Sequence, residues 1–313
     1  MTENKQAHES SGSLKYFSSA FLAAALWGFM SIPLRAIREW SSFDILYFRI
    51  LVSCLLIWIF IFIFRKKQWA ADRIYIRSLS NPDKKRLFIL TLIASFLIMG
   101  NWFTYIYAVN HISVQSAAFA YMVCPLLTTL AGYLILKERL SSLKKLGLVI
   151  ALISVVMLAQ GSLIEVVWSV AVALLYALYL VVQRIIQHVD KLNLLAVQIS
   201  LCSLVILPFM ILSGNDLPQA RVFWWNITVI AVLFTIIPLY MSMYALNGIS
   251  SSTAGILIYI NPIIAFAVAI YYFHEPVSTL KLIAYAILLI SIVLFNWEFV
   301  RGIRQQKQFT SSS

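Results

Sequence analysis

Several polar and aromatic side chains interrupt the apolar segments of this chain at spacings that place them on one side of a helix. Asn101 and Tyr105 are four residues apart, and Trp102 directly follows Asn101. Residues four apart share a helical face. An amide beside aromatic rings can hydrogen-bond to a small organic molecule and stack against it. The chemistry that this spacing predicts is noncovalent recognition.

The same residue types recur within other apolar segments. Trp27 lies in the first segment, Tyr121 in the fourth, and Asn261 in the ninth. The candidates for one shared, aromatic-lined substrate cavity are Trp27, Arg49, Asn101, Trp102, Tyr105, Tyr121, Tyr259 and Asn261. The alternative is ordinary helix packing, in which polar side chains bond across helices.

Arg49 is the one charged residue well inside a predicted span. It lies about five residues past the start of the second span, roughly 7 Å deep at 1.5 Å per residue. Its guanidinium could attract a substrate carboxylate. Alternatively, it could reach outward to lipid headgroups or pair with Asp44, although a separation of five does not place the two on one helical face.

Two prolines occupy matching places in the fourth and ninth spans. Pro125 and Pro262 each remove a helical hydrogen bond and crowd the preceding turn, so a bend is expected at each. Such bends are tolerated within a membrane where a cavity or a neighbouring helix accommodates the freed carbonyl. We expect them to act in gating, and static kinks are the alternative.

Acidic residues are confined to the edges of the predicted spans. Aspartate and glutamate total 12, and each falls in a loop, at a terminus or within a few residues of a span end. Ionisable residues deep in a membrane are costly and usually functional. Their scarcity argues against proton antiport through an internal carboxylate, and leaves facilitated exchange or coupling through water and polar groups.

Other chemistry lacks a sequence signature. The chain has no GxxxxGK[ST] phosphate loop, its four histidines are scattered without metal-ligand spacing, and its three cysteines form no disulfide pattern. We therefore expect no cofactor, no metal and no enzyme activity. A membrane-embedded enzyme and a non-transporting scaffold remain as alternatives, which counterflow of labelled metabolites in proteoliposomes would distinguish from a carrier.

The elements that position these residues are predicted to be membrane-spanning helices. Hydrophobic residues make up 62% of the chain and charged residues 12%, and a crossing takes roughly 20 apolar residues. The apolar runs are continuous, unlike the alternating strands of an outer-membrane barrel. An all-α integral membrane protein with ten transmembrane helices is expected, with spans at 17–35, 44–64, 87–109, 114–136, 143–160, 163–183, 192–213, 222–246, 251–273 and 279–299.

Residues 108–158 and 245–295 align without a gap at an offset of 137. Asn110 matches Asn247, Pro125 matches Pro262, and Glu138 matches Glu275. Duplicated halves of five spans each enter the membrane in opposite senses, because five is odd. Two inverted five-helix repeats, residues 17–160 and 161–299, are therefore predicted, an architecture typical of alternating-access carriers with a site near the midplane.

Lysine and arginine are concentrated on one side of this topology. Of the 24, 19 fall in segments on the side of both termini, which by the positive-inside rule is the cytoplasm. The net charge of +12 then reflects topology and anionic lipid rather than nucleic-acid binding. Residues 1–16 are expected to form a disordered cytoplasmic leader, with no cleaved signal peptide, and 300–313 a cytoplasmic tail.

Four fragments together resemble the RarD-like permeases of the EamA family, in the drug/metabolite transporter superfamily. They are ALWGFMSIPL in the first span, GNWFTYIYAVN at 100–110, YMVCPL with KERL in and after the fourth, and YINP with HEP in and after the ninth. The resemblance covers residues 17–299. It implies a ten-helix bacterial inner-membrane protein that exports small metabolites or drugs, with a small-molecule substrate, the lipid bilayer and a candidate homodimer as partners.

Overall fold

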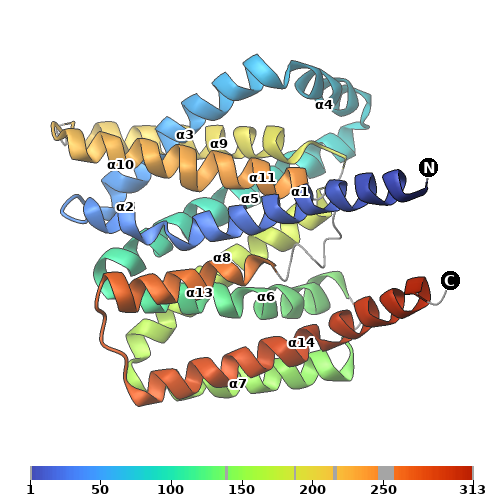
Figure 1. The fold of residues 1–313 in the computed structure, drawn as a ribbon. Helices are drawn as coiled ribbons and strands as arrows, with labels where there is room; N and C mark the ends of the chain where they lie inside the picture. The colour runs from blue at the N-terminus through green and yellow to red at the C-terminus, as the bar shows by residue number, and fades with distance from the viewer. Residues whose placement is uncertain (1, 138–139, 187, 214–216, 246–256, 312–313) are drawn as a thin grey trace.

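In this computed structural model, the described residues are 2–137, 140–186, 188–213, 217–245 and 257–311, and they form helices without any strand (Figure 1). The helices of the amino-terminal half are α1 (Thr2–Gly28), α2 (Ser31–Ala36), α3 (Ser42–Phe64), α4 (Lys66–Ser78), α5 (Asn81–Tyr107), η1 (Ala108–Ile112), α6 (Val114–Leu136) and α7 (Ser142–Gly161). Those of the carboxy-terminal half are α8 (Leu163–Ile185), α9 (Lys191–Ser213), α10 (Arg221–Ala231), η2 (Val232–Ile236), α11 (Ile237–Ala245), α13 (Ile260–Ala267), η3 (Val268–Tyr272) and α14 (Thr279–Ser311).

Serine caps start many of these helices. Ser41, Ser80, Ser113, Ser141 and Ser162 each accept a hydrogen bond from the backbone N–H three residues later. An N-cap hydroxyl satisfies one of the four N–H groups that have no partner within the helix. The short polar turns of the sequence thus become defined helix starts.

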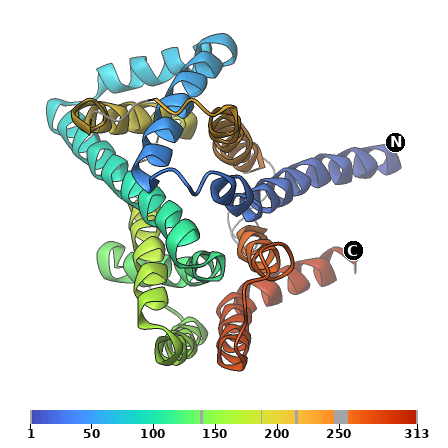
Figure 2. The ribbon, with the colours of Figure 1, turned by 90° about the vertical axis from the view of Figure 1, so that its left-hand side faces the viewer.

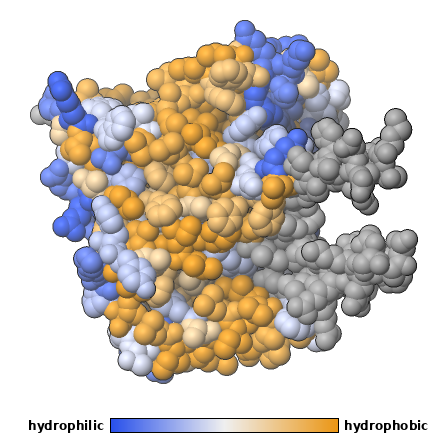
Figure 3. Space-filling model, viewed as in Figure 1, coloured by the Kyte–Doolittle hydropathy of each residue, from blue (hydrophilic) through white to orange (hydrophobic). Residues whose placement is uncertain are grey.

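Eight helices within the described ranges are long and apolar enough to cross a membrane. Ten crossings were expected. Two further apolar helices, Ile260–Tyr272 and Thr279–Leu294, are shorter, and the predicted ninth span begins within 246–256, which lies outside the described residues. Apolar side chains cover most of the face seen in Figure 3, and hydrophilic ones gather along the edge at which α2 lies and over α4. Such exposed apolar surface suits contact with lipid rather than water.

The structure differs from the expectation for the amino terminus. Helix α1 runs back to Thr2, whereas residues 1–16 were predicted to be disordered. The segment has no proline, and Glu3, Lys5, Gln6, Ala7 and Glu9 are residue types with high helix propensity, so the first span can continue as helix beyond its apolar part.

The basic segment between α3 and α5 is also folded. Its helix α4 contributes Asp72, whose carboxylate accepts hydrogen bonds from the Asn193 side chain (2.7 Å) and the Asp190 backbone (3.2 Å). Arg65, directly before α4, pairs with Asp190 at 2.6 Å. These contacts attach α4 to the start of α9.

Helices α7 and α14 pack side by side through two reciprocal hydrogen bonds (Figure 1). Ser154 Oγ donates to the carbonyl of Ala284 at 2.7 Å, and Ser291 Oγ donates to that of Gly147 at 2.6 Å. Ser154 and Ser291 are 137 residues apart, as are Gly147 and Ala284. The same contact therefore occurs twice, and the pairing shows that the two helices run antiparallel.

Other helix pairs are matched in the same way. Helix α6 packs on α8 as α13 packs on α1, and α5 packs on α9 as α10 packs on α3. Viewed from the end at which α2 lies, α5 and α8 are on one side of the bundle and α1 and α13 on the other (Figure 2). The middle of the bundle is therefore bordered by helices from both halves of the chain.

Candidate functional site

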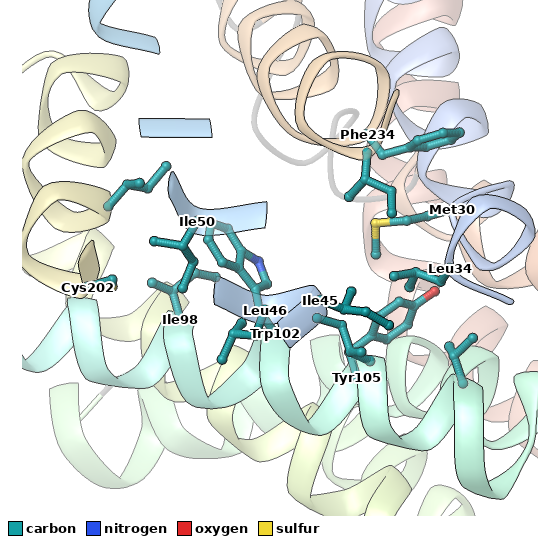
Figure 4. Packing of buried hydrophobic residues seen from close by; sticks show 14 of the residues in the cluster. Met30, Leu34, Ile45, Leu46, Ile50, Ile98, Trp102, Tyr105, Cys202 and Phe234 are labelled. Atoms are coloured by element: carbon teal, nitrogen blue, oxygen red, sulfur yellow. The ribbon is translucent and has the colours of Figure 1, made fainter. Parts of the chain in front are cut away.

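A cavity of about 240 Å³ lies between these helices. Figure 4 shows one part of its surroundings: Trp102 and Tyr105 rise from α5, and Met30 and Phe234 approach from the opposite side. Seven of the eight residues proposed from the sequence line this cavity, namely Trp27, Arg49, Asn101, Trp102, Tyr105, Tyr121 and Asn261. They come from α1, α3, α5, α6 and α13, so the structure brings together residues from five separate helices.

Tyr259 does not line the cavity. It packs in a separate apolar cluster that includes Phe119 and Tyr285. Tyr259 precedes Asn261 by two residues, and two residues turn a helix by about 200°. The two side chains therefore cannot share a face, and only Asn261 points to the cavity.

Several residues that line the cavity were not among the candidates predicted from the sequence. Tyr176 and Tyr179 of α8, together with Phe234 and Thr235 of η2, also line the cavity. The two tyrosines are three residues apart within an apolar span, and a spacing of three, like the spacing of four in α5, places side chains on one helical face. The spacing of these two tyrosines was therefore a signal in the sequence that could have identified them.

Arg49 is buried inside the protein, with 2% of its surface exposed. Its guanidinium carbon lies 4.5 Å from the centre of the Trp102 ring, and its Nη2 donates to Thr235 Oγ1 at 3.5 Å. Nε and Nη1 have no hydrogen-bond partner among the described residues. The side chain thus faces the cavity instead of reaching lipid headgroups or Asp44.

Tyrosine rings form a continuous series along the cavity. The ring centres of Tyr105 and Tyr121 are 5.5 Å apart, those of Tyr121 and Tyr176 are 5.8 Å apart, and those of Tyr176 and Tyr179 are 5.9 Å apart. The Tyr179 hydroxyl donates to Gln198 Oε1 at 3.2 Å. Centre distances of 4.5–7 Å are typical of favourable aromatic pairs, so the tyrosines support one another as a wall.

The side-chain amide of Asn101 uses its nitrogen, but not its oxygen, in a hydrogen bond within the protein. Its Nδ2 donates to the carbonyl of Val172 at 2.9 Å, while its Oδ1 is buried without a partner among the described residues. A buried acceptor without a donor is costly. Asn101 therefore offers an acceptor to a molecule in the cavity.

Trp27 links the two halves of the chain beside the cavity. Its indole Nε1 donates to the carbonyl of Phe234 at 3.1 Å. Pro238 has no N–H, so it cannot donate to the carbonyl four residues earlier as an ordinary helical residue would, and Trp27 binds that carbonyl. The adjacent Gly28 allows close approach, because a Cβ there would lie 2.6 Å from the Cβ of Ile264 in α13.

The two matched prolines have different local settings. Pro125 lies inside α6, so the carbonyl of Tyr121, a cavity residue, loses its helical donor. Pro262 lies in the first turn of α13, directly after the helix interruption at Tyr259, where a missing N–H costs nothing. Neither proline lines the cavity.

A cluster of charged residues closes the end of the bundle near α2. We call it the ion-pair end and define it by Arg35, Glu165, Glu275 and Lys281. Arg35 pairs with Glu275 at 2.6 Å, donates to the carbonyl of Val109 at 3.0 Å, and lies 4.8 Å from the Phe273 ring centre. Every one of these contacts joins segments far apart in the sequence.

Glu275 also caps helix α6. Its carboxylate accepts hydrogen bonds from the backbone N–H groups of Val114 (2.8 Å) and Gln115 (3.1 Å). A carboxylate at a helix N-terminus satisfies free N–H groups and interacts favourably with the helix dipole. Nearby, Glu165 pairs with Lys281 at 2.8 Å and accepts from Ser116 Oγ at 3.0 Å.

Metal chemistry has no support from the arrangement of side chains. In the part of the chain that the structure describes, no group of three or more His, Cys, Asp or Glu side chains is placed to hold a metal ion. What the cavity offers is stacking surface, amide and hydroxyl groups, and one guanidinium.

Comparison with known proteins places this arrangement in a family. The chain is 29% identical over 90% of its length to an uncharacterized transporter, YojE, from Bacillus subtilis, covering 93% of that protein. It is 24% identical over 88% of its length to the protein RarD of Escherichia coli, covering 92% of it. A solved structure with 16% identity matches the fold with a TM-score of 0.59, over 93% of this chain and 98% of the other.

The profile of the EamA-like transporter family matches this chain twice, over residues 14–160 and 163–297. The resemblance noted from the sequence motifs is thereby confirmed. The family and the names of the relatives point to transport rather than to enzyme activity. The chain belongs to the EamA-like transporter family and is a multi-pass membrane transporter of the drug/metabolite kind.

Proposed function

We propose that this protein is a secondary transporter that exports small organic metabolites or drugs across the bacterial inner membrane by alternating access. The cavity between the two halves is the observation that supports this most. The cavity is lined by α1, α3, α5 and α6 of the first half and by α8, α9, η2, α11 and α13 of the second half. A cavity at the boundary of two repeats can be exposed to either side by movement of one repeat against the other.

The proposal includes ten crossings arranged as two inverted repeats, residues 17–160 and 161–299. The reciprocal serine contacts of α7 and α14 support it, because an antiparallel pair with equivalent contacts is what a two-fold axis in the membrane plane produces. The two family matches divide the chain between residues 160 and 163, close to the proposed boundary.

We further propose that both termini face the cytoplasm. The concentration of lysine and arginine on their side supports this orientation. The ion-pair end then faces away from the cytoplasm, since α2 lies at the opposite end of the bundle from both termini (Figure 1). A lipid bilayer surrounds the bundle, and a homodimer is the candidate assembly.

Binding followed by flux tests the function. Purified protein is first screened for thermal stabilisation by a metabolite panel, because a ligand that binds the folded state raises the melting temperature. A stabilising compound is then supplied in radiolabelled form to proteoliposomes preloaded with the unlabelled compound. Transient uphill accumulation of label supports a carrier, and flux no greater than in empty liposomes contradicts it.

The matched prolines provide a test of gating. We expect Pro125→Ala to slow counterflow several-fold while ligand binding is retained, because restoring the helical ladder removes the bend beside Tyr121. Pro262→Ala is the matched variant and should have a smaller effect, since Pro262 lies in the first turn of α13. Unchanged rates in both variants would contradict a gating role.

A further inference from the structure

We infer that the cavity selects organic monoanions, and that its preferred ligand is a single-ring aromatic carboxylate bound by Arg49. This inference rests on the proposed transport function only in regarding the cavity as the substrate site. Three observations carry it. Arg49 has unfilled hydrogen-bonding capacity, the described residues that line the cavity include no acidic side chain, and the walls are aromatic.

The guanidinium has five N–H donors in a planar fork that matches a carboxylate. In this structure only Nη2 reaches an acceptor, and the 3.5 Å contact with Thr235 is at the limit of a hydrogen bond. Nε and Nη1 are buried and without partners among the described residues. At least one edge of the fork is therefore open to a bidentate ligand.

Among the described residues that line the cavity, none is acidic and able to neutralise this charge. The described lining residues include no Asp, Glu or Lys, and Arg49 is the single Arg among them. Residues 246–256, which lie outside the described ranges, contain none of these four residue types. An unpaired buried charge is costly, and an anion that pairs with it relieves that cost.

The same charge balance excludes other ligands. A cation would be repelled by Arg49, and an α-amino acid would bring an ammonium group that finds no carboxylate among the described lining residues. A neutral amide could fill the space but would forgo the charge-assisted hydrogen bonds, which are roughly twice as strong as neutral ones. The preferred ligand therefore carries a carboxylate and no ammonium.

The walls and the volume define the rest of the ligand. One face of the guanidinium is covered by Trp102, and the Tyr105, Tyr121 and Tyr176 rings follow in series. A cavity of about 150 Å³ is known to hold one benzene molecule, so 240 Å³ accommodates one ring with its carboxylate and a further small substituent. The unpaired Oδ1 of Asn101 can accept from a hydroxyl on such a ring.

Three probes of similar shape test the charge preference on the unaltered protein. Benzoate, benzamide and benzylammonium are titrated into the full-length purified protein while the melting temperature and the tryptophan fluorescence are recorded. We expect benzoate to bind at least about tenfold more tightly than benzamide, the ratio for losing one charge-assisted contact, and benzylammonium not to bind. Equal binding of all three, or no binding of benzoate, would overturn the inference.

Variants of Arg49 locate the effect. In Arg49→Met the preference for benzoate over benzamide should vanish, and in Arg49→Lys it should persist but weaken, because lysine keeps the charge without the fork. The matched control is Arg38→Gln, which removes an exposed arginine and should leave the preference unchanged. A preference that survives in Arg49→Met would contradict the assignment.

Counterflow separates this inference from the proposed function. If benzoate binds through Arg49 but shows no counterflow, the inference about anion binding stands, and the proposal that the protein transports this class of compound is contradicted. Counterflow of a neutral or cationic solute that is unaffected by Arg49→Met would support the carrier and overturn the anion preference.

Discussion

Arg35 and Arg49 show what one residue type does in two regions of the same bundle. Arg35, at the ion-pair end, has a carboxylate, a carbonyl and an aromatic ring as partners. Arg49, at the cavity, has an aromatic ring and one long contact. The first arginine joins segments of the fold. The second retains bonding capacity that the protein itself does not use, which is the property expected of a ligand-binding group.

Exchanging the charges at the ion-pair end should have the largest effect on stability. The double variant Arg35→Glu with Glu275→Arg keeps opposite charges in place, but it puts a cation against the N-terminus of α6, where Glu275 binds two backbone N–H groups. We expect a loss of about 4 kcal/mol, because both the cap and the helix-dipole interaction are reversed. Thermal unfolding in detergent measures it.

A swap that restored native stability would mean that the pair acts through charge alone. The exposed neighbours Arg38 and Glu39 provide a matched control. The same exchange there should change stability by less than about 0.5 kcal/mol.

Removing only the negative charge at position 275 should have the next largest effect on stability. Glu275→Gln leaves Arg35 without its carboxylate and weakens the cap of α6. Breaking a fully buried pair costs 3–5 kcal/mol, and this pair is 10–17% exposed, so we expect about 2–3 kcal/mol. The melting temperature of Glu275→Gln is compared with that of Glu39→Gln, which serves as the exposed control. Equal melting temperatures for the two variants would refute the role given to Glu275.

The more exposed pair of the same end should matter less. Lys281 and Glu165 have 17% and 24% of their side chains exposed, and solvent-accessible ion pairs contribute up to about 1 kcal/mol. We expect Lys281→Met to cost about that much and the cost to shrink at high salt. If Lys281→Met lowered the free energy of unfolding by more than about 2 kcal/mol, independently of salt, this pair would contribute as much as Arg35 and Glu275.

Arg49 should respond in the opposite way. Arg49→Met removes a buried, incompletely paired charge and retains the apolar stem, so the melting temperature should stay the same or rise. A fall like that of Glu275→Gln would make Arg49 a structural residue and remove the contrast between the two arginines.

The helices and most of the cavity were predictable, because both follow from short-range rules. Continuous apolar runs give the spans, and a spacing of four gives the shared face of Asn101 and Tyr105. Tyr259 was misplaced because it was grouped with Asn261, which lies two residues away and therefore on a different helical face. Tyr176 and Tyr179 were overlooked, although their spacing of three also places two side chains on one helical face.

The ion-pair end could not be predicted from short-range rules. Arg35 and Glu275 are 240 residues apart, and their meeting depends on how the two halves pack. In the sequence, Arg35 was only a charge near the edge of a span, and Glu275 was only a landmark of the repeat and part of the HEP motif. The repeat indicated that the halves are equivalent, but it did not specify which charges would meet across the interface.

Access to the cavity from both sides tests the central claim most directly. Ser242 lines the cavity and is half-buried, so Ser242→Cys, made in a chain whose three native cysteines are replaced by alanine, reports on access to it. Membrane-impermeant maleimide is added to right-side-out and to inside-out vesicles. We predict labelling in both, and protection by benzoate from either side. Labelling from one side only, in every condition, would contradict alternating access.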